Sequence, residues 1–130
     1  MDQKSQFKVL VVEDEFFTAK YLCEELKDLN VDPLNPVPKG ELAVEVALKE
    51  LPDLILMDIR LAGGMDGIEA AKKIQESKYI PVIFMSAFAT DYIVERAKGV
   101  TYIDFFEKPI NMDMLSPIID GLRKSNSTMI

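Results

Sequence analysis

The most informative absence in this 130-residue sequence is that of histidine, which does not occur at all. Without an imidazole the chain has no Ser-His or Cys-His nucleophile, no histidine metal ligand and no histidine general base. The single cysteine, Cys23, has no second cysteine for an intrachain disulfide and no histidine to share a metal, so we expect a thiol in the core.

Long apolar runs are also missing, and basic residues are fewer than acidic ones. No apolar run approaches the length that crosses a bilayer, and residues 1–6 are polar rather than signal-like, which predicts a cytoplasmic location. Lys and Arg total 15 against 22 Asp and Glu, a formal net charge of −7. Such an acidic chain is not expected to bind nucleic acid or an anionic membrane directly.

What is present has the composition of a folded domain. Apolar residues make up 48% and charged residues 28% of the chain, which is long enough to bury a core. Apolar residues with helical spacing occur over 16–29, 43–51 and 115–122, and more weakly over 68–77 and 91–97. The first of these apolar faces comprises Phe16, Ala19, Leu22, Cys23, Leu26 and Leu29.

Continuous apolar runs of strand length alternate with these helices, at 7–12, 54–57, 82–85 and 102–106. Runs without polar alternation are typical of strands that are buried on both faces of a parallel sheet. One more strand is expected near 31–37. It should lie at the sheet edge, because its prolines cannot donate hydrogen bonds to a central ladder.

Strands that alternate with helices predict a layered α/β fold with right-handed crossovers. Five β/α units account for the sequence. We therefore expect a single domain over residues 1–130, with a core of about 7–124 and short tails at both ends. The segment Ser125 to Ile130 is expected to be a frayed tail.

Chemically active side chains follow the ends of four of the apolar runs. Glu13 and Asp14 follow the first run, Asp58 the second, Ser86 the third and Lys108 the fourth. Because open α/β sheets bind ligands beyond the carboxyl ends of their strands, we expect these side chains to converge on one rim. Each alone has an ordinary interpretation as a helix cap, a turn residue or a solvated lysine. Taken together, these residues have no such ordinary interpretation, because carboxylates that repel one another gather only where a cation compensates their charge.

Such a cluster has the chemistry of a divalent-cation site. Crowded carboxylates resist joint ionisation, and Mg²⁺ relieves their repulsion while it keeps several waters and accepts phosphate oxygens. Phosphoryl transfer needs a nucleophilic oxygen, a metal, a fixed cation and a hydrogen-bond donor. Asp58, Mg²⁺, Lys108 and Ser86 fill these roles in that order.

The same residues carry a resemblance to the response-regulator receiver family of two-component signalling, over about residues 8–124. The motifs are Val11-Val12-Glu13-Asp14-Glu15, Leu54-Ile55-Leu56-Met57-Asp58-Ile59, Met65-Asp66-Gly67, Pro81-Val82-Ile83, Ser86-Ala87 and Lys108-Pro109. The resemblance implies a flavodoxin-like (βα)5 fold with parallel strand order 2-1-3-4-5. It also implies a phosphorelay function, in which a sensor histidine kinase or a histidine phosphotransfer protein donates the phosphoryl group. A monomer or a weak phosphorylation-dependent dimer, acting on an unidentified output protein or domain, is expected.

The resemblance also assigns individual roles. Asp58 looks like the phosphoacceptor, Ser86 like the hydroxyl that turns to meet the phosphoryl group, and Lys108 like its counter-charge, with a cis bond before Pro109. The implied Mg²⁺ ligands are the carboxylates of Asp14 and Asp58, the backbone carbonyl of Arg60 and, through water, Glu13.

Two further pairs of residues are implied to control the signal. Ser86 and Phe105 are the candidates that relay phosphorylation to the face formed by the fourth helix, the fifth strand and the fifth helix. Arg60 and Phe88, two residues beyond Asp58 and Ser86, are expected to flank the path of attacking water and to gate dephosphorylation. For Phe105 plain core packing is the alternative, and for Arg60 and Phe88 the alternative is that both are loop residues that point to solvent. The exposed candidates on the output face are Tyr92, Glu95, Arg96 and Asp113, for which an ordinary surface role is the alternative.

The sequence departs from the commonest pattern of this family without losing a reacting group. Glu13 stands where aspartate is more usual, and Phe105 lacks a tyrosine hydroxyl. The loop from Asp58 to Asp66 is one residue longer than expected, with Ala62 where proline is common.

Two other functions use the same residues. A metal-dependent phosphohydrolase with Asp58 as its nucleophile needs an acid/base carboxylate two residues on, but Arg60 occupies that position and no cap domain is present. A pseudo-receiver acts as an interaction module without phosphorylation, and the complete set of site residues argues against it. We therefore expect a domain that catalyses only its own phosphorylation and dephosphorylation, rather than an enzyme.

Overall fold

The computed structural model describes residues 6–128, in which strands and helices alternate. The predicted N-terminal tail lies almost entirely outside these residues. In chain order the elements are β1 (Lys8–Val12), α1 (Phe16–Asp28), β2 (Asp32–Pro33), α2 (Gly40–Glu50), β3 (Leu54–Asp58), α3 (Gly67–Ser77), β4 (Val82–Ser86), α4 (Asp91–Arg96), a 3-10 turn η1 (Ala97–Gly99), β5 (Asp104–Glu107) and α5 (Met112–Thr128). Within residues 6–128 no helix has the length and apolar character that a bilayer crossing requires.

The strands form one parallel sheet in the order β2-β1-β3-β4-β5, which confirms the predicted flavodoxin-like topology. The proline-rich strand β2 lies at the edge, as predicted. It pairs with β1 over only two residues, and the chain returns to the sheet at a single bridge between Val12 and Val37. Proline cannot donate to a ladder, which accounts for this short and interrupted edge.

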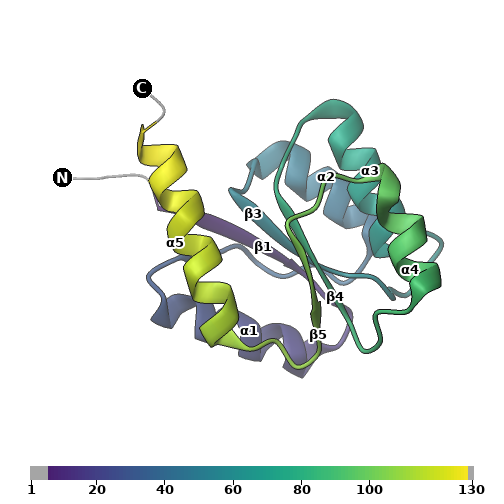
Figure 1. Ribbon diagram of the computed structural model, residues 1–130, viewed down its shortest axis with the longest axis horizontal. Helices are drawn as coiled ribbons and strands as arrows, with labels where there is room; N and C mark the ends of the chain where they lie inside the picture. The colour runs from purple at the N-terminus through teal and green to yellow at the C-terminus, as the bar shows by residue number, and fades with distance from the viewer. Residues whose placement is uncertain (1–5, 129–130) are drawn as a thin grey trace.

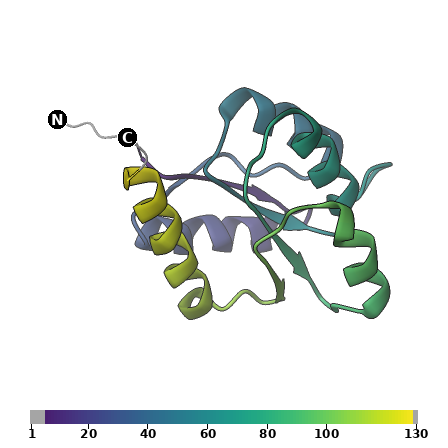
Figure 2. The same cartoon turned by 45° about the horizontal axis from the view of Figure 1, so that its top comes forward.

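Helices cover both faces of the sheet (Figures 1 and 2). Helices α1 and α5 pack on one face, and α2, α3 and α4 lie on the other. Alternate residues of each strand serve the two layers: in β1, Leu10 and Val12 join the core under α2 and α3, whereas Val9 and Val11 join the core under α1 and α5. This double burial explains why the strands appear in the sequence as continuous apolar runs.

Three residues on the predicted apolar face of α1 are not fully buried: Phe16 is exposed, and Cys23 and Leu29 are half-buried. Phe16, the first residue of the helix, is 68% exposed and packs edge-on against the neighbouring ring of Phe17, 5.2 Å away. Cys23 is half-buried: it packs against the core under α1 and also lines a surface groove with Pro33 and Pro36, so the prediction of a core thiol is only partly right. Burial nonetheless raises the pKa of the Cys23 thiol, which keeps it protonated near neutral pH.

The last two elements differ from the predicted bounds. Strand β5 begins at Asp104 rather than at residue 102. Just before it, the side-chain amide of Gln75 binds both the backbone N–H (3.0 Å) and the C=O (2.8 Å) of Thr101. Helix α5 continues to Thr128, so the predicted fraying from Ser125 was wrong for residues 125–128, while residues 129–130 lie outside the described chain. Arg123 fastens this helix to the end of α1 by donating to the carbonyl oxygens of Leu29 and Asn30, at 2.9 and 2.6 Å.

Candidate functional site

The carboxyl ends of the strands bring the predicted side chains together at one rim. β3 ends at Asp58 and β4 ends at Ser86, while Glu13 and Lys108 directly follow β1 and β5. Ligand oxygens of Glu13, Asp14 and Asp58 lie within 4.8 Å of one another. The convergence that the sequence predicted is therefore present in the structure.

Asp58 is held at the end of the central strand by contacts to both of its carboxylate oxygens. Its Oδ2 accepts a hydrogen bond from Lys108 Nζ at 2.8 Å, and its Oδ1 accepts one from the Arg60 backbone amide at 3.2 Å. The residue is only 4% exposed. Its backbone is fixed as well, because Gly67 approaches so closely that an added Cβ would overlap the Asp58 carbonyl group. These contacts leave the carboxylate few orientations, which favours a nucleophile that must meet its target in one geometry.

Glu13 is the second buried carboxylate, and its environment disfavours ionisation. Burial raises the pKa of Glu13, and the nearby charge of Asp58 adds to this effect, whereas Lys108 and the Glu15 amide oppose it. Oε2 accepts from the Glu15 amide at 3.0 Å, and Oε1 lies 2.7 Å from Lys108 Nζ. That second contact lacks hydrogen-bond geometry, so among residues 6–128 the buried Oε1 has an ionic neighbour but no hydrogen-bond donor.

Lys108 supplies one ammonium to these carboxylates. Burial works against its charge, but the hydrogen bond to Asp58 and the close ion pair with Glu13 outweigh that effect and raise the pKa of Lys108 above its usual value. The Lys108–Pro109 peptide bond is cis, as the resemblance implied. Lys108 therefore stays protonated at neutral pH and faces more negative charge than it can neutralise alone.

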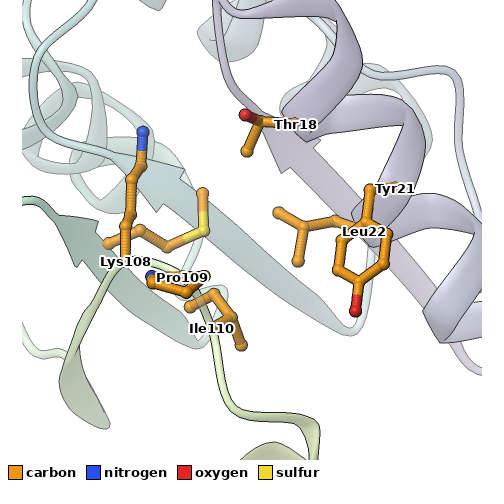
Figure 3. A pocket seen from close by; sticks show the side chains of 7 residues that line it. Thr18, Tyr21, Leu22, Lys108, Pro109 and Ile110 are labelled. Atoms are coloured by element: carbon orange, nitrogen blue, oxygen red, sulfur yellow. The ribbon is translucent and has the colours of Figure 1, made fainter.

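The aliphatic part of Lys108 is supported by a pocket that the sequence did not predict. A small apolar pocket lies between α1 and the segment after β5, lined by Tyr21, Leu22, Pro109 and Ile110 (Figure 3). The aliphatic part of Lys108 lines this pocket, and its ammonium nitrogen points away from Ile110. Lysine side chains commonly pack their methylene groups on apolar surface while the ammonium group stays in a polar environment. Here this packing directs the ammonium group of Lys108 toward Asp58.

Asp14 is the exposed member of the three carboxylates, and the lengthened loop after Asp58 reaches it. Its Oδ2 accepts a hydrogen bond from the Ala62 amide at 3.2 Å. Ala62 also forms a bridge with Lys39, and Gly63 turns the loop with a φ of 96°, a conformation that disfavours other residues. The extra loop residue is thus accommodated by a glycine turn beside the acidic cluster.

The donor set fits a hard divalent cation. Three carboxylates lie within reach of one point, one of their buried oxygens has no hydrogen-bond donor, and the exposed Asp14 opens the cluster to solvent. Carboxylate oxygens combined with water are the ligands that Mg²⁺ prefers. Arg60 directs its amide at Asp58, and the role of its carbonyl as a ligand stays a prediction.

Ser86 hydrogen-bonds to the backbone of Phe88, one of the two predicted gate residues. The Ser86 hydroxyl is buried, donates to the Phe88 carbonyl oxygen at 2.7 Å and accepts from the Phe88 amide at 3.2 Å. Phe88 is itself 72% exposed and Arg60 is exposed too. Neither side chain is packed into the acidic cluster in this arrangement, and their gating role stays a prediction.

The second predicted switch residue, Phe105, lies on β5, and the predicted output residues lie on α4 and α5. Phe105 is half-buried in an aromatic cluster, with its ring centroid 5.3 Å from Phe84 and 5.0 Å from Tyr102. Tyr92, Glu95 and Asp113 are exposed, as expected.

Arg96, in contrast, was wrongly assigned to the exposed surface. It is half-buried and pairs with Asp66, with 2.7 Å between Nη1 and Oδ2. The spacing of Asp66 and Glu69 is that of a capping box, so the sequence could have predicted this start of α3. The ion pair of Asp66 with Arg96 could not be predicted in this way, because 30 positions separate the two residues.

Comparison with known proteins places this geometry in context. The chain matches the family model described as response regulator receiver domain over residues 9–120. The transcriptional regulatory protein PdtaR of Mycobacterium tuberculosis is 32% identical over 113 residues, which cover 87% of this chain and 55% of that protein. The chain thus spans only about half of that relative.

Two further proteins match over almost their whole length. Sporulation initiation phosphotransferase F of Bacillus subtilis is 30% identical over 118 residues, which cover 90% of this chain and 91% of that protein. The receiver domain of a sensor histidine kinase from Pseudomonas aeruginosa, solved with a magnesium ion coordinated in its active-site cleft, superposes with a TM-score of 0.80 at 26% identity. That match covers 91% of this chain and 98% of the other.

Proposed function

Because this chain belongs to the response regulator receiver family, we propose that it accepts a phosphoryl group on Asp58 from a phosphohistidine of a partner protein. The observation that carries the proposal is the Asp58 carboxylate, which ends the central strand between Lys108 and two further carboxylates. The phosphohistidine must lie outside these 130 residues, which contain no histidine, and we propose a sensor histidine kinase or a histidine phosphotransfer protein as the donor. Its output protein or domain is a further partner.

The transfer is a displacement at phosphorus. A carboxylate oxygen of Asp58 forms the new O–P bond while the P–N bond of the phosphohistidine breaks, and the imidazole leaves with that electron pair and takes up a proton. Lys108 places a fixed positive charge beside the attacking carboxylate, where it also meets the phosphoryl oxygens as they arrive. The contacts to both Asp58 oxygens orient the nucleophile before the donor binds.

The acidic cluster is proposed to hold Mg²⁺. Asp14 and Asp58 would bind it through their carboxylates, Arg60 through its backbone carbonyl and Glu13 through water. When bound, Mg²⁺ offsets the charge of the carboxylates and of the phosphoryl oxygens. The proposal is supported by the buried Glu13 oxygen without a hydrogen-bond donor and by the magnesium ion of the Pseudomonas receiver domain.

Phosphorylation is proposed to change the surface of the domain through Ser86 and Phe105. The Ser86 hydroxyl leaves the Phe88 carbonyl and donates to the phosphoryl group instead, which frees the segment that leads into α4. Phe105 is half-buried beside Phe84 and can repack when that segment moves. Coupling of this kind typically amounts to about 1–3 kcal/mol, and the output partner reads it on the face formed by α4, β5 and α5.

A metal-dependent labelling experiment tests this function against its rivals. The chain is incubated with acetyl phosphate, with Mg²⁺ or with a chelator, and phosphoprotein and inorganic phosphate are followed together. The proposal expects a lasting phosphoprotein that forms only with Mg²⁺. Continuous turnover of the donor without phosphoprotein would indicate a phosphohydrolase, and the absence of both would indicate an interaction module.

A further inference from the structure

Helix α4 is weakly packed, and its end is held by an ion pair of Arg96 and by Ala97, the buried residue that directly follows the helix. None of the six residues Asp91–Arg96 is buried, although Ile93 packs partly against the core. A helix this short has little stability of its own. Arg96, its last residue, pairs with Asp66 at 2.7 Å, and the two side chains are only 27% and 28% exposed.

The partner, Asp66, is built into the start of α3 by hydrogen bonds. Its Oδ1 accepts from the Glu69 amide at 2.9 Å, and the Glu69 carboxylate accepts from the Asp66 amide at 2.9 Å, which completes a capping box. The other carboxylate oxygen, Oδ2, is the one that contacts Arg96. Burial raises the pKa of Asp66, but Arg96 and the Glu69 amide outweigh it and hold the pKa below its usual value, so the pair is ionised at neutral pH.

The start of α3 is in turn packed against the phosphoacceptor strand. The Gly67 amide donates to the Ile59 carbonyl oxygen at 2.8 Å. A Cβ on Gly67 would fall on the carbonyl group of Asp58, so backbone meets backbone here without an intervening side chain. A displacement of Asp66 therefore reaches the backbone of Asp58 through a single residue.

From these contacts we propose that Arg96 is a positioning residue of the phosphoacceptor site, which acts through Asp66 and holds α4 in the arrangement described above. The proposal rests on the proposed function and adds to it the element that resists switching. Helix α4 is tied at both ends: the Ser86–Phe88 contacts restrain the segment before it, and the Arg96–Asp66 pair restrains its last turn.

The direction of the effect follows from linkage. The Ser86 hydroxyl must leave Phe88 to meet a phosphoryl group, and an intact pair at the other end of α4 opposes the movement that follows. A contact made more strongly in one arrangement lowers the affinity for a ligand that favours the other. Loss of the pair should therefore tighten the binding of beryllofluoride, a phosphoryl mimic, by on the order of fivefold.

Four single variants, the double variant Arg96→Gln, Asp66→Asn, and two measurements test the proposal. Arg96→Gln and Asp66→Asn each remove one charge, and asparagine still caps α3. Arg96→Lys keeps the charge. Lys98→Gln is the matched control, because Lys98 lies two residues after Arg96, in η1, and its ion-pair partner Glu95 is exposed. The measurements are the apparent affinity for beryllofluoride with Mg²⁺, and the amide hydrogen exchange of residues 91–96 and 59–66 without it.

The expected result is about fivefold tighter beryllofluoride binding in Arg96→Gln and in Asp66→Asn, no further gain when they are combined, and wild-type behaviour in Arg96→Lys and Lys98→Gln. Exchange should rise in both segments. Unchanged affinity in the two neutralising variants, or faster exchange in 91–96 alone, overturns the proposal. Failure of the wild type to bind beryllofluoride would instead overturn the proposed function, and the exchange of the two segments would still decide whether Arg96 acts on the phosphoacceptor loop.

Discussion

The ammonium of Lys108 lies 2.8 Å from a carboxylate oxygen of Asp58, although 50 positions separate the two residues in the sequence. The same nitrogen lies 2.7 Å from Glu13. Two carboxylates that are almost fully buried thus share one ammonium that is itself partly exposed. This arrangement keeps the carboxylate of the proposed phosphoacceptor oriented, and it leaves negative charge for a divalent cation to offset.

Replacement of Lys108 by alanine should impair switching more than folding. The change leaves two buried carboxylates without their cation, and we expect a loss of about 1–3 kcal/mol in the free energy of unfolding, part of which Mg²⁺ should restore. Chemical denaturation with and without Mg²⁺ measures this loss. Beryllofluoride should fail to shift the NMR signals of α4 and β5 fully in this variant. Wild-type shifts would show that Lys108 does not relay the signal, and Lys98→Ala serves as the control for the loss of a surface lysine.

Asp14→Ala should weaken Mg²⁺ binding at least about tenfold, since a carboxylate that is expected to coordinate the ion is lost. The side chain is exposed, so the free energy of unfolding should change by less than about 0.5 kcal/mol. Titration calorimetry measures the affinity, with Asp120→Ala on α5 as the matched control. Equal Mg²⁺ affinity in Asp14→Ala and wild type would mean that the ligand assignment is wrong.

The double variant Arg60→Asn, Phe88→Ala should lose its phosphoryl group about tenfold faster than wild type, a change of about 1.4 kcal/mol in the barrier. The long cation and the exposed ring are expected to close over the acyl phosphate and to obstruct the in-line path of water. Phosphate loss from the purified phosphoprotein is followed over time, with Tyr92→Ala as the control for removal of an exposed aromatic ring. Decay at the wild-type rate would exclude these side chains as the gate.

The Asp66–Arg96 pair should make the free energy of unfolding depend on pH in the acidic range. The pKa of Asp66 is lowered in the folded state from a usual value of 3.8, so its contribution is complete above that value and is lost as the pH falls through the folded pKa. Wild type should exceed Asp66→Asn in the free energy of unfolding by about 1 kcal/mol at pH 7. That difference should shrink below about pH 4. Denaturation at several pH values checks it, and a difference that grows on acidification would contradict the assignment.

The site residues were predictable because the topology of a parallel sheet places the carboxyl ends of its strands at one edge. An apolar run followed by Asp58, and another followed by Ser86, therefore indicates a shared rim even without a structure. The edge position of β2 followed from its prolines in the same way, since a missing N–H is a local property.

Other features depend on neighbours that no local pattern records. Helical periodicity placed Phe16 on the same face as Ala19, but periodicity does not tell whether that end of the helix has anything to pack against. Arg96 looked like a surface residue because its partner, Asp66, lies on another element. The small pocket beside Lys108 likewise combines residues of α1 with residues after β5.

The most direct test of the central claim is the intact mass of the protein after incubation with acetyl phosphate and Mg²⁺. The wild type should gain one phosphoryl group, and Asp58→Asn, which keeps the size and polarity of the side chain but removes its nucleophilic carboxylate, should gain none. Circular dichroism of both proteins controls for folding. An equal gain of mass in the folded Asp58→Asn variant would contradict the assignment of Asp58 as the phosphoacceptor.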